Sequence, residues 1–227
     1  MREVIVLCEG RTEQEFCRSV VAPSLHPLGI SVSGRLAGKP GRKHGGISPW
    51  AGYQREIINL GKQRNDWFVG LLVDYYAMPH SWPGRAAAAQ KPDGEKGRHV
   101  EEAIAEAVRP ELGGRFLPCV QLHEFESLLF VSPAVTASSL VVAGETLPVP
   151  ILERRMAEIV AESGGAVERI NDTPTGAPSK RLIRLVPGYD KVLSGVLAAK
   201  SIGLGELRSG CPWLDRWLLA LESLATP

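Results

Sequence analysis

The stretch VIVLCEGRTE, residues 4–13, decides the fold. Residues 4–7 form an apolar run of the kind found in strands that are buried on both faces of a parallel sheet. Glu9 follows this run, and a helical pattern with Glu13 in its first turn begins shortly afterwards. Open α/β folds bind their ligands at the carboxyl ends of the strands. The Glu9 carboxylate is therefore predicted to lie at a ligand-binding edge.

The rest of the chain alternates strand and helix patterns. Strands are expected at 3–8, 30–36, 67–73 and 115–122, and helices at 12–25, 51–63, 98–109, 151–163 and 212–224. Residues 37–49 are expected to form a long loop, and residues 77–97 a mobile excursion. A capping box of Thr12 and Glu15 is expected to start the first helix.

This alternation predicts a doubly wound, mostly parallel, four-stranded α/β sheet with helices on both faces. The core is assigned to residues 1–132, and residues 133–227 are expected to form a mainly helical extension packed on it as one structural unit. Hydrophobic content of 44% and charged content of 22% are ordinary for a globular protein. A net charge of +1 gives no global attraction to nucleic acid or to membranes, so any such surface must be local.

The cysteines and the start of the chain indicate the cellular setting. The four cysteines form no C-x-x-C pair, which argues against a zinc knuckle or a disulfide framework. No apolar stretch approaches the length of a membrane span. The first residues run directly into strand-like sequence, which is unlike a signal peptide. We expect a cytoplasmic protein that does not bind membranes.

Acidic residues follow three of the four predicted strands. Glu9 follows the first, Asp74 the third, and Glu124 and Glu126 the fourth. In a doubly wound sheet these strand ends can lie near one another, and converging carboxylates repel unless a cation compensates them. Mg²⁺ or Mn²⁺ suits such hard oxygen ligands and would polarise a phosphodiester and activate water. We predict such an ion on these acids, with Glu13 as a further ligand.

A purely structural explanation is open for each of these residues taken singly. Glu13 and Glu126 fall in the first turns of predicted helices, where the helix dipole favours acids, and strand ends are usually polar. His123 is open as a general base, a metal ligand or a hydrogen-bonded structural residue. If the strand continues through this stretch, alternation places His123 on the opposite face of the strand from Glu124 and Glu126. This placement favours the structural role.

Two basic clusters are candidates for contact with phosphate. Arg42 and Lys43 lie in a glycine-rich loop, and Lys180 and Arg181 lie in a later basic segment. Such residues near a cation site would give salt-dependent affinity for a nucleic-acid backbone without reading its sequence. A solvated loop explains the first cluster equally well.

Several motifs resemble those of known families. LCEGRTEQEF (7–16) and LLVDYYAMP (71–79) resemble the first two motifs of the Toprim fold of primases, topoisomerases and overcoming-lysogenization-defect nucleases. FLPCVQLHEFESLLF (116–130), APSKRL (177–182) and CPWLDRWLLALE (211–222) resemble more closely a bacterial Toprim-like family, domain of unknown function 4276, over nearly the whole chain. The resemblance implies that Glu9, Asp74 and Glu126 are metal-site acids, supported by Glu13 and Glu124.

The chain departs from the Toprim pattern at Tyr76, where the second motif usually has a second Asp. A phenol with a pKa of about 10 is a poor Mg²⁺ ligand near neutral pH. Either Glu124 or Glu126 substitutes for the acid, or the site holds one metal or none.

We therefore predict a metal-dependent nuclease, with Glu9, Asp74, Glu124, Glu126 and His123 as candidate catalytic residues. The expected substrate is nucleic acid, with DNA placed ahead of RNA. The resemblance also implies an ATPase partner in genome defence, and a homodimer is allowed. Two alternatives remain: a non-catalytic subunit that binds nucleic acid or an ATPase, and a phosphohydrolase acting on a small nucleotide.

Overall fold

The structure is a computed structural model that describes residues 1–38, 47–140, 147–170 and 176–225. It divides into two compact units, one of Met1–Leu122 with Arg216–Pro227 and one of His123–Asp215. The expected boundary lay after residue 132, whereas the first unit ends at Leu122. The chain also returns to the first unit at Arg216, within its last helix.

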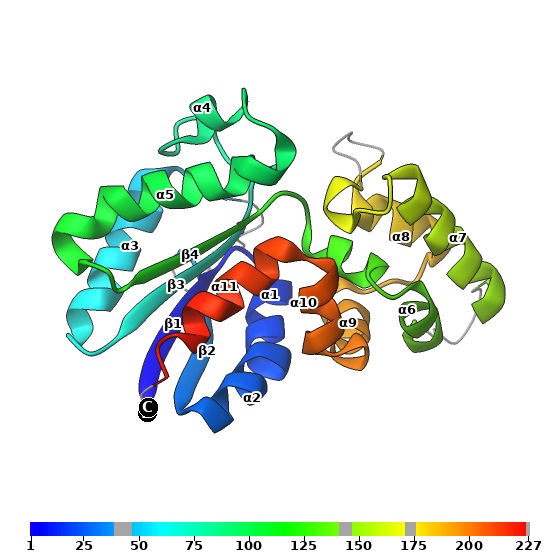
Figure 1. The fold of residues 1–227 in the computed structure, drawn as a ribbon, viewed down its shortest axis with the longest axis horizontal. Helices are drawn as coiled ribbons and strands as arrows, with labels where there is room; N and C mark the ends of the chain where they lie inside the picture. The colour runs from blue at the N-terminus through cyan, green and yellow to red at the C-terminus, as the bar shows by residue number, and fades with distance from the viewer. Residues whose placement is uncertain (39–46, 141–146, 171–175, 226–227) are drawn as a thin grey trace. The chain divides into compact units, whose positions relative to one another are not determined.

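Four parallel strands form the sheet of the first unit (Figure 1). They are β1 (Arg2–Cys8), β2 (Ile30–Leu36), β3 (Phe68–Asp74) and β4 (Phe116–Gln121), in the order β2-β1-β3-β4. The central pair runs from Val4 opposite Phe68 to Cys8 opposite Leu72. The predicted parallel α/β sheet is confirmed, and the central place of β3 explains its unbroken apolar sequence.

One face of the sheet is covered by α3 (Trp50–Gln63) and α5 (Asp93–Leu112). Leu7, Leu71 and Val73 of the strands pack there with Ile57 and Ile104 of these helices. Helix α5 begins earlier than expected and continues through its proline into the last turn. The loss of one backbone donor near a helix end is tolerated, since this late proline leaves the preceding turns intact.

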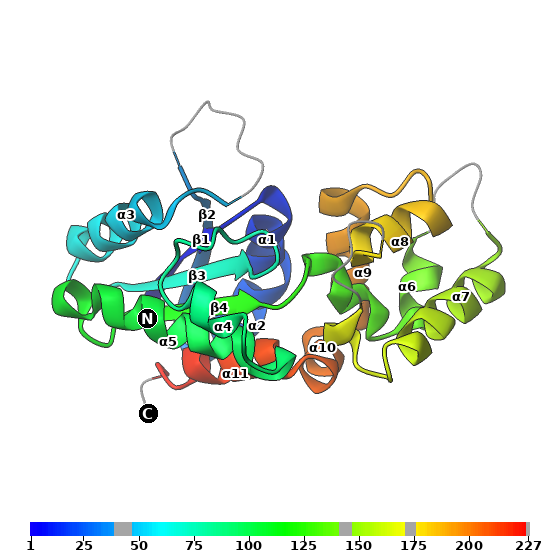
Figure 2. The ribbon, with the colours of Figure 1, turned by 90° about the horizontal axis from the view of Figure 1, so that it is seen from above.

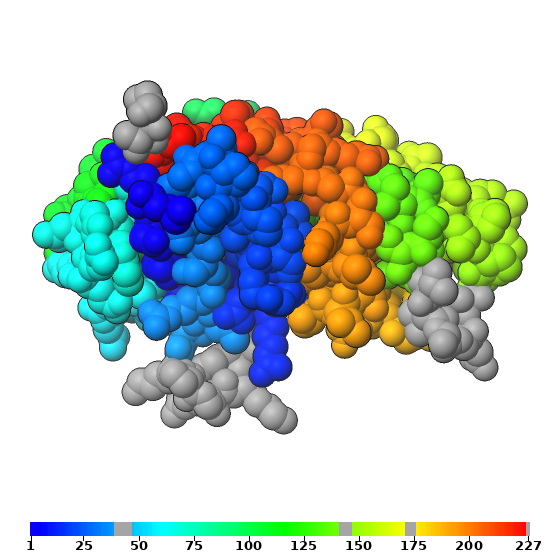
Figure 3. Space-filling view, turned by 90° about the horizontal axis from the view of Figure 1, so that it is seen from below, coloured from blue at the N-terminus to red at the C-terminus, as the bar shows by residue number. Residues whose placement is uncertain are grey.

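The opposite face is covered by the N-terminal helical segment and by α11 (Pro212–Glu222) (Figure 1). The segment consists of α1 (Arg11–Phe16), a π-helical turn (Cys17–Val21), α2 (Ala22–Leu25) and a 3-10 turn (His26–Leu28). On the side shown in Figure 3, residues 1–36, in blue, form much of the surface of the first unit. Trp217 of α11 donates its indole N–H to the Leu117 carbonyl of β4 over 3.1 Å.

The expected capping box at the start of α1 is wrong. Gly10, in an extended conformation, occupies the N-cap position, and no side chain caps the helix. Thr12 therefore lies inside α1, where it is buried, and it stands two positions after the N-cap, too late for its hydroxyl to cap the first turn.

The excursion expected at 77–97 is folded against the core. It contains α4 (Arg85–Ala88), which lies next to α5 in both views (Figures 1 and 2), and α5 itself begins within it. Trp82 is 2% exposed, its ring lies 4.9 Å from that of Tyr53, and its indole N–H donates to the Ser48 carbonyl over 3.0 Å. The prediction of a mobile segment is wrong, because Met78, Trp82 and Ala88 of this segment are buried in the hydrophobic core.

All regular structure described in the second unit is helical. The elements are a 3-10 helix (Phe125–Phe130), α6 (Pro133–Ser139), α7 (Val149–Glu162), a 3-10 turn (Val167–Arg169), α8 (Pro178–Leu185), a π-helical turn (Lys191–Gly195), α9 (Val196–Ile202) and α10 (Leu204–Gly210). Its buried residues include Leu128, Phe130, Met156 and Leu182. None of the helices in the described parts of the chain has both the length and the apolar character needed to cross a membrane.

Candidate functional site

Glu9 and Asp74 lie at the carboxyl ends of the neighbouring strands β1 and β3. The backbone N–H of Asp74 donates to Glu9 Oε2 over 3.2 Å, although the two residues are 65 positions apart in sequence. The backbone N–H of Glu9 in turn donates to the Leu72 carbonyl over 3.2 Å. The parallel pairing thus brings two of the predicted metal-site acids to one edge of the sheet.

Gln121 extends this edge onto β4. It is paired with Asp74 across the sheet, and its side-chain amide donates to Asp74 Oδ1. Gln121 is 1% exposed, so its amide is fixed by the strand around it. Gln121 is not among the site residues predicted from the sequence. Its signal was its position as the last residue of the strand that precedes the His-Glu-Phe-Glu string.

Glu13 folds back from α1 toward the end of β1. A Cβ atom built on Gly10 would lie 2.8 Å from Glu13 Oε2, so the absence of a side chain at Gly10 leaves room for this carboxylate. The pKa of the Cys8 thiol is raised by its hydrogen bond with Cys17 and by burial, and the charge of Glu13 raises it further. Glu13 therefore lies beside the end of β1, as the motif predicted.

The aromatic residues of this region have different surroundings. Burial raises the pKa of Tyr53, and the charge of Glu9 adds to the effect, which places the Tyr53 hydroxyl near that acid. Tyr75 is 6% exposed and packs in the core. Tyr76, at the position of the second acid of the Toprim motif, is 43% exposed.

The donor set of this edge suits a hard divalent cation in type. Mg²⁺ commonly takes one or two carboxylates and keeps several waters, and Glu9 and Asp74 supply two carboxylates on adjacent strands. Within the described residues, no group of three or more His, Cys, Asp or Glu side chains is placed to hold a metal ion. The two carboxylates at this edge therefore agree with a hard divalent cation in ligand type, but they do not form a set of three protein ligands among the described residues.

A second acidic group lies in the second unit, on the 3-10 helix Phe125–Phe130. Glu126 is 1% exposed, and its Oε1 lies 3.2 Å from Lys191 Nζ and 3.5 Å from the Tyr189 hydroxyl, which donates to it. Burial raises the pKa of Glu126, while the charge of Lys191 opposes this shift. The sequence analysis did not identify Lys191 or Tyr189, which lie in a short irregular stretch without a motif.

Glu124 connects two of the motifs found in the sequence. Its Oε2 accepts the backbone N–H of Ser179 over 2.9 Å, at the N-terminal end of α8. Its Oε1 lies 3.8 Å from Lys191 Nζ. The Glu124 carboxylate therefore links the start of the 3-10 helix to the start of α8. This is a structural role, separate from any role in catalysis. His123, directly before it, is 8% exposed.

A family model described as Domain of unknown function (DUF4276) matches residues 8–222. The chain belongs to this family. The match includes Glu9, Glu13, Asp74, Glu124 and Glu126, and so covers the candidate acids of both units of this DUF4276 protein. No curated protein matches the chain.

Solved structures of similar fold are C-terminal regions of OLD proteins. That of the Burkholderia pseudomallei OLD protein has a TM-score of 0.50 and 14% identity, with all of both chains covered. That of the Xanthomonas campestris pv. campestris OLD protein has a TM-score of 0.40 and 15% identity, with 97% of this chain and 94% of that chain covered. The DUF4276 protein thus has a Toprim-like α/β fold, as the motifs predicted.

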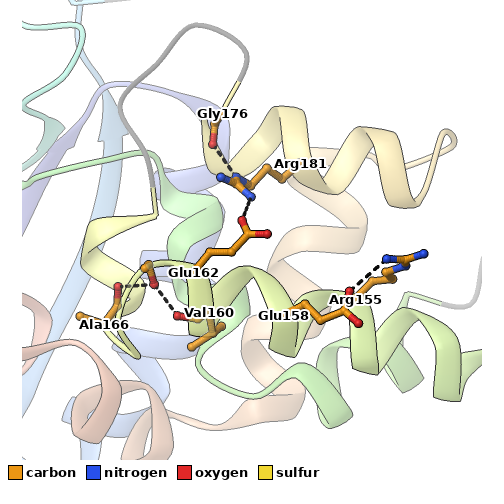
Figure 4. Close-up of polar contacts among 8 residues, drawn as sticks. Arg155, Glu158, Val160, Glu162, Ala166, Gly176 and Arg181 are labelled. Atoms are coloured by element: carbon orange, nitrogen blue, oxygen red, sulfur yellow. Dashed lines mark hydrogen bonds and ion pairs between the residues drawn. The ribbon is translucent and has the colours of Figure 1, made fainter.

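The basic residues of the DUF4276 protein differ in how far their charges are neutralised. Arg181 donates from Nε to the Gly176 carbonyl and from Nη1 to Glu162 Oε2, each over 2.9 Å (Figure 4). Lys180, one residue earlier on α8, is exposed. The predicted phosphate ligands Arg42 and Lys43 lie outside the described residues. Of the four predicted cations, Lys180 is exposed to solvent and Arg181 is engaged within its own unit.

Proposed function

We propose that this DUF4276 protein is a metal-dependent nucleic-acid phosphodiesterase of the Toprim type. The observation that carries the proposal is the contact between the Glu9 carboxylate and the Asp74 backbone N–H at the ends of adjacent parallel strands. Ligand sites of open α/β sheets lie at this edge. The fold shared with the OLD C-terminal region agrees with the motif resemblance to overcoming-lysogenization-defect nucleases, from which the class of activity is proposed.

Glu9 and Asp74 are the proposed ligands of Mg²⁺ or Mn²⁺, with Glu13 beside them. When bound, such an ion neutralises charge on a scissile phosphate and lowers the pKa of an attacking water. Gln121 holds the Asp74 carboxylate through its amide N–H, so that an Asp74 oxygen is fixed in position before any ligand arrives. Preorganised ligands of this kind spare the cost of ordering them on binding.

Glu126, Glu124 and His123 are proposed to act in proton transfer or as further ligands. Glu126 suits proton transfer because burial raises its pKa toward the range in which a carboxyl group can both give and accept a proton. The Lys191 Nζ atom lies 3.2 Å from Glu126 Oε1, so its positive charge stabilises the ionised form of this acid. Lys180 is the proposed contact for the substrate backbone.

The partner and the substrate follow from the family resemblance. An ATPase partner is proposed, with DNA ahead of RNA as substrate. A non-catalytic subunit that binds nucleic acid or an ATPase is the second candidate. The exposed Tyr76, in place of a second acid, favours it because this position offers no carboxylate to a metal.

Calorimetric titration with Mn²⁺ and Mg²⁺ separates the two candidates. Wild type, Glu9→Gln and Asp74→Asn are compared with Glu102→Gln, which changes an exposed acid of α5 that pairs with Arg98. The proposal expects metal binding in wild type and in the control, and its loss in both site variants. Glu126→Gln in the same titration tests whether that acid contributes to metal binding.

Cleavage is measured on plasmid, single-stranded DNA, RNA and nucleotides with Mn²⁺, with and without a co-encoded ATPase. Asp74→Asn should cleave at least about a hundredfold more slowly than wild type, as expected when a group that stabilises the transition state is lost. Binding of nucleic acid without cleavage, in a protein that takes up neither Mn²⁺ nor Mg²⁺, would support the binding subunit. Equal cleavage by wild type and Asp74→Asn would reject the proposed site.

A further inference from the structure

Tyr75 and Arg85 form a stacked pair just beyond the end of β3. The Arg85 Cζ atom lies 3.8 Å from the centroid of the Tyr75 ring, and Arg85 Nη1 donates to the Tyr75 hydroxyl over 2.8 Å. Tyr75 directly follows Asp74, and its backbone N–H donates to the Gln121 carbonyl over 2.7 Å. The guanidinium is therefore tied to the strand end that carries the proposed metal ligand.

The charge of Arg85 has no carboxylate partner in the described parts of the chain. Its hydrogen bond goes to a neutral phenol, and its Nε is buried without any acceptor. Residues 75–92 contain no Asp or Glu. In the same unit, Arg115 donates to three backbone carbonyls, whereas five arginines pair with an acid: Arg18, Arg64, Arg98, Arg109 and Arg216. A guanidinium keeps its charge at any relevant pH, and Arg85 is only partly buried, so its Nη groups keep further N–H donors for an external anion.

The backbone that carries Arg85 is held firmly. Gly84, at the start of α4, has a φ of 74°, and a Cβ there would lie 2.7 Å from Ala103 Cβ and 3.1 Å from the His99 carbonyl oxygen. Helix α4 therefore packs directly on α5. On its other side, Trp82 is buried in the core and its carbonyl accepts the Arg85 backbone N–H over 3.0 Å. A side chain placed in this way loses little freedom when it binds.

We propose that Arg85, held flat on Tyr75, binds a backbone phosphate of a nucleic acid. The identity of the ligand rests on the proposed function. A planar guanidinium matches a phosphate group with two parallel N–H donors, and aromatic stacking sets the orientation of that plane. Tyr76, next in the chain and 43% exposed, offers a ring on which a base can stack, which favours nucleic acid over free phosphate.

The test measures binding of a fluorescent single-stranded oligonucleotide and a duplex by anisotropy, in EDTA so that no cleavage occurs. Arg85→Gln should weaken binding about tenfold, and the slope of log K against log salt should fall by about 0.7 for the single strand and about 0.9 for the duplex. Arg85→Lys should recover part of the affinity, because it keeps the charge but not the fork of donors. Arg98→Gln is the matched control on α5 and should bind as wild type does.

Thermal unfolding of each variant shows whether it is folded, and Tyr75→Phe removes only the hydroxyl that positions Arg85. A folded Arg85→Gln that binds with the wild-type affinity and salt slope would overturn the proposal, as would a wild type that binds neither oligonucleotide. Competition by inorganic phosphate at the concentration of nucleotide phosphate would assign the site to free phosphate instead. Cleavage is read separately with Mn²⁺, so a wild type that binds but does not cleave overturns the proposed function and leaves the Arg85 site standing.

Discussion

The Glu126 carboxyl group is buried, and its nearest cation is Lys191 at 3.2 Å. Burial raises the pKa of Glu126, so the folded protein holds this proton more tightly than the unfolded chain does. Stability is then lost as pH rises from the usual pKa of a glutamate through the raised pKa of the folded state. Glu126→Gln removes this titration.

We therefore expect the free energy of unfolding of Glu126→Gln, measured relative to wild type, to increase as pH rises above the usual glutamate pKa of about 4.3. Urea denaturation at several pH values measures this difference. Glu102→Gln, which changes an exposed acid, should show a much flatter difference. A relative stability of Glu126→Gln that decreases over this range would show that Lys191 dominates and that the pKa is lowered.

Gln121 is expected to matter for the position of Asp74 as well as for stability. Gln121→Leu replaces the amide by an apolar side chain of similar size and so removes the donor to Asp74 Oδ1. A buried polar contact of this kind contributes about 1–2 kcal/mol. Urea denaturation should show a loss of that order, and Mn²⁺ affinity should fall while Asp74 is still present. Unchanged Mn²⁺ affinity in a destabilised Gln121→Leu would confine Gln121 to a structural role.

The positions of Glu9 and Asp74 could be predicted because each directly follows an apolar strand, and parallel strands end at the same edge of a sheet. Gln121 was not predicted because the site was inferred from acidic residues at strand ends, and an amide carries no charge. Lys191 could not be found from the sequence, because its approach to Glu126 depends on packing among helices far apart in the chain.

At the scale of the elements, α5 packs closely on β4 at Gly97. A Cβ at Gly97 would collide with the backbone carbonyl oxygen of Val120, which cannot move without shifting the strand. Gly94, on the same helix, has no atom within 4 Å of the position of its Cβ. Substitution of Gly94 by alanine therefore measures helix propensity alone, whereas the same substitution at Gly97 also measures the packing of α5 on β4.

Gly97→Ala should destabilise the protein by about 1–3 kcal/mol, because overpacking forces the helix away from the sheet. Gly94→Ala should stabilise it by about 0.5 kcal/mol, because alanine loses less backbone entropy in a helix. Urea denaturation of both variants measures the two signs. If both variants were stabilised, α5 would have to lie farther from β4 than the structure places it.

The element boundaries were predicted best where local sequence decides them. Strand β2 was predicted at its observed bounds, and α3 and α7 lie within two residues of the helices predicted at 51–63 and 151–163. Helix α5 was predicted too short because its first turn is polar and glycine-containing, and packing on β4 supports it there. Tertiary contacts override weak helix propensity.

At the scale of the whole chain, α11 completes a unit whose other elements end at residue 122. Arg216 pairs with Glu101 over 2.9 Å, and Trp217 reaches Leu117, 100 positions earlier. From the sequence, this helix was expected to belong to a C-terminal extension. Its amphipathic pattern shows that one face is buried, but no local pattern shows against which partner.

Adjacent residues of α11 test this arrangement. Leu218 is 0% exposed and Leu219 is 52% exposed. Leu218→Ala should cost about 2–5 kcal/mol, as deletion of a buried leucine side chain usually does, and Leu219→Ala less than about 0.5 kcal/mol. Thermal and urea unfolding measure both. Equal small losses would mean that α11 does not cover the sheet.

All four cysteines of the chain, Cys8, Cys17, Cys119 and Cys211, are buried. Burial raises the pKa of Cys211, and thiols kept protonated in this way react slowly with maleimides. The native cysteines are therefore expected to take up little label. Glu102→Cys would add one accessible thiol in the first unit, and Lys200→Cys would add one in the second unit. A single spin label at either position would report on the local order of its own unit in solution, without removal of any native cysteine.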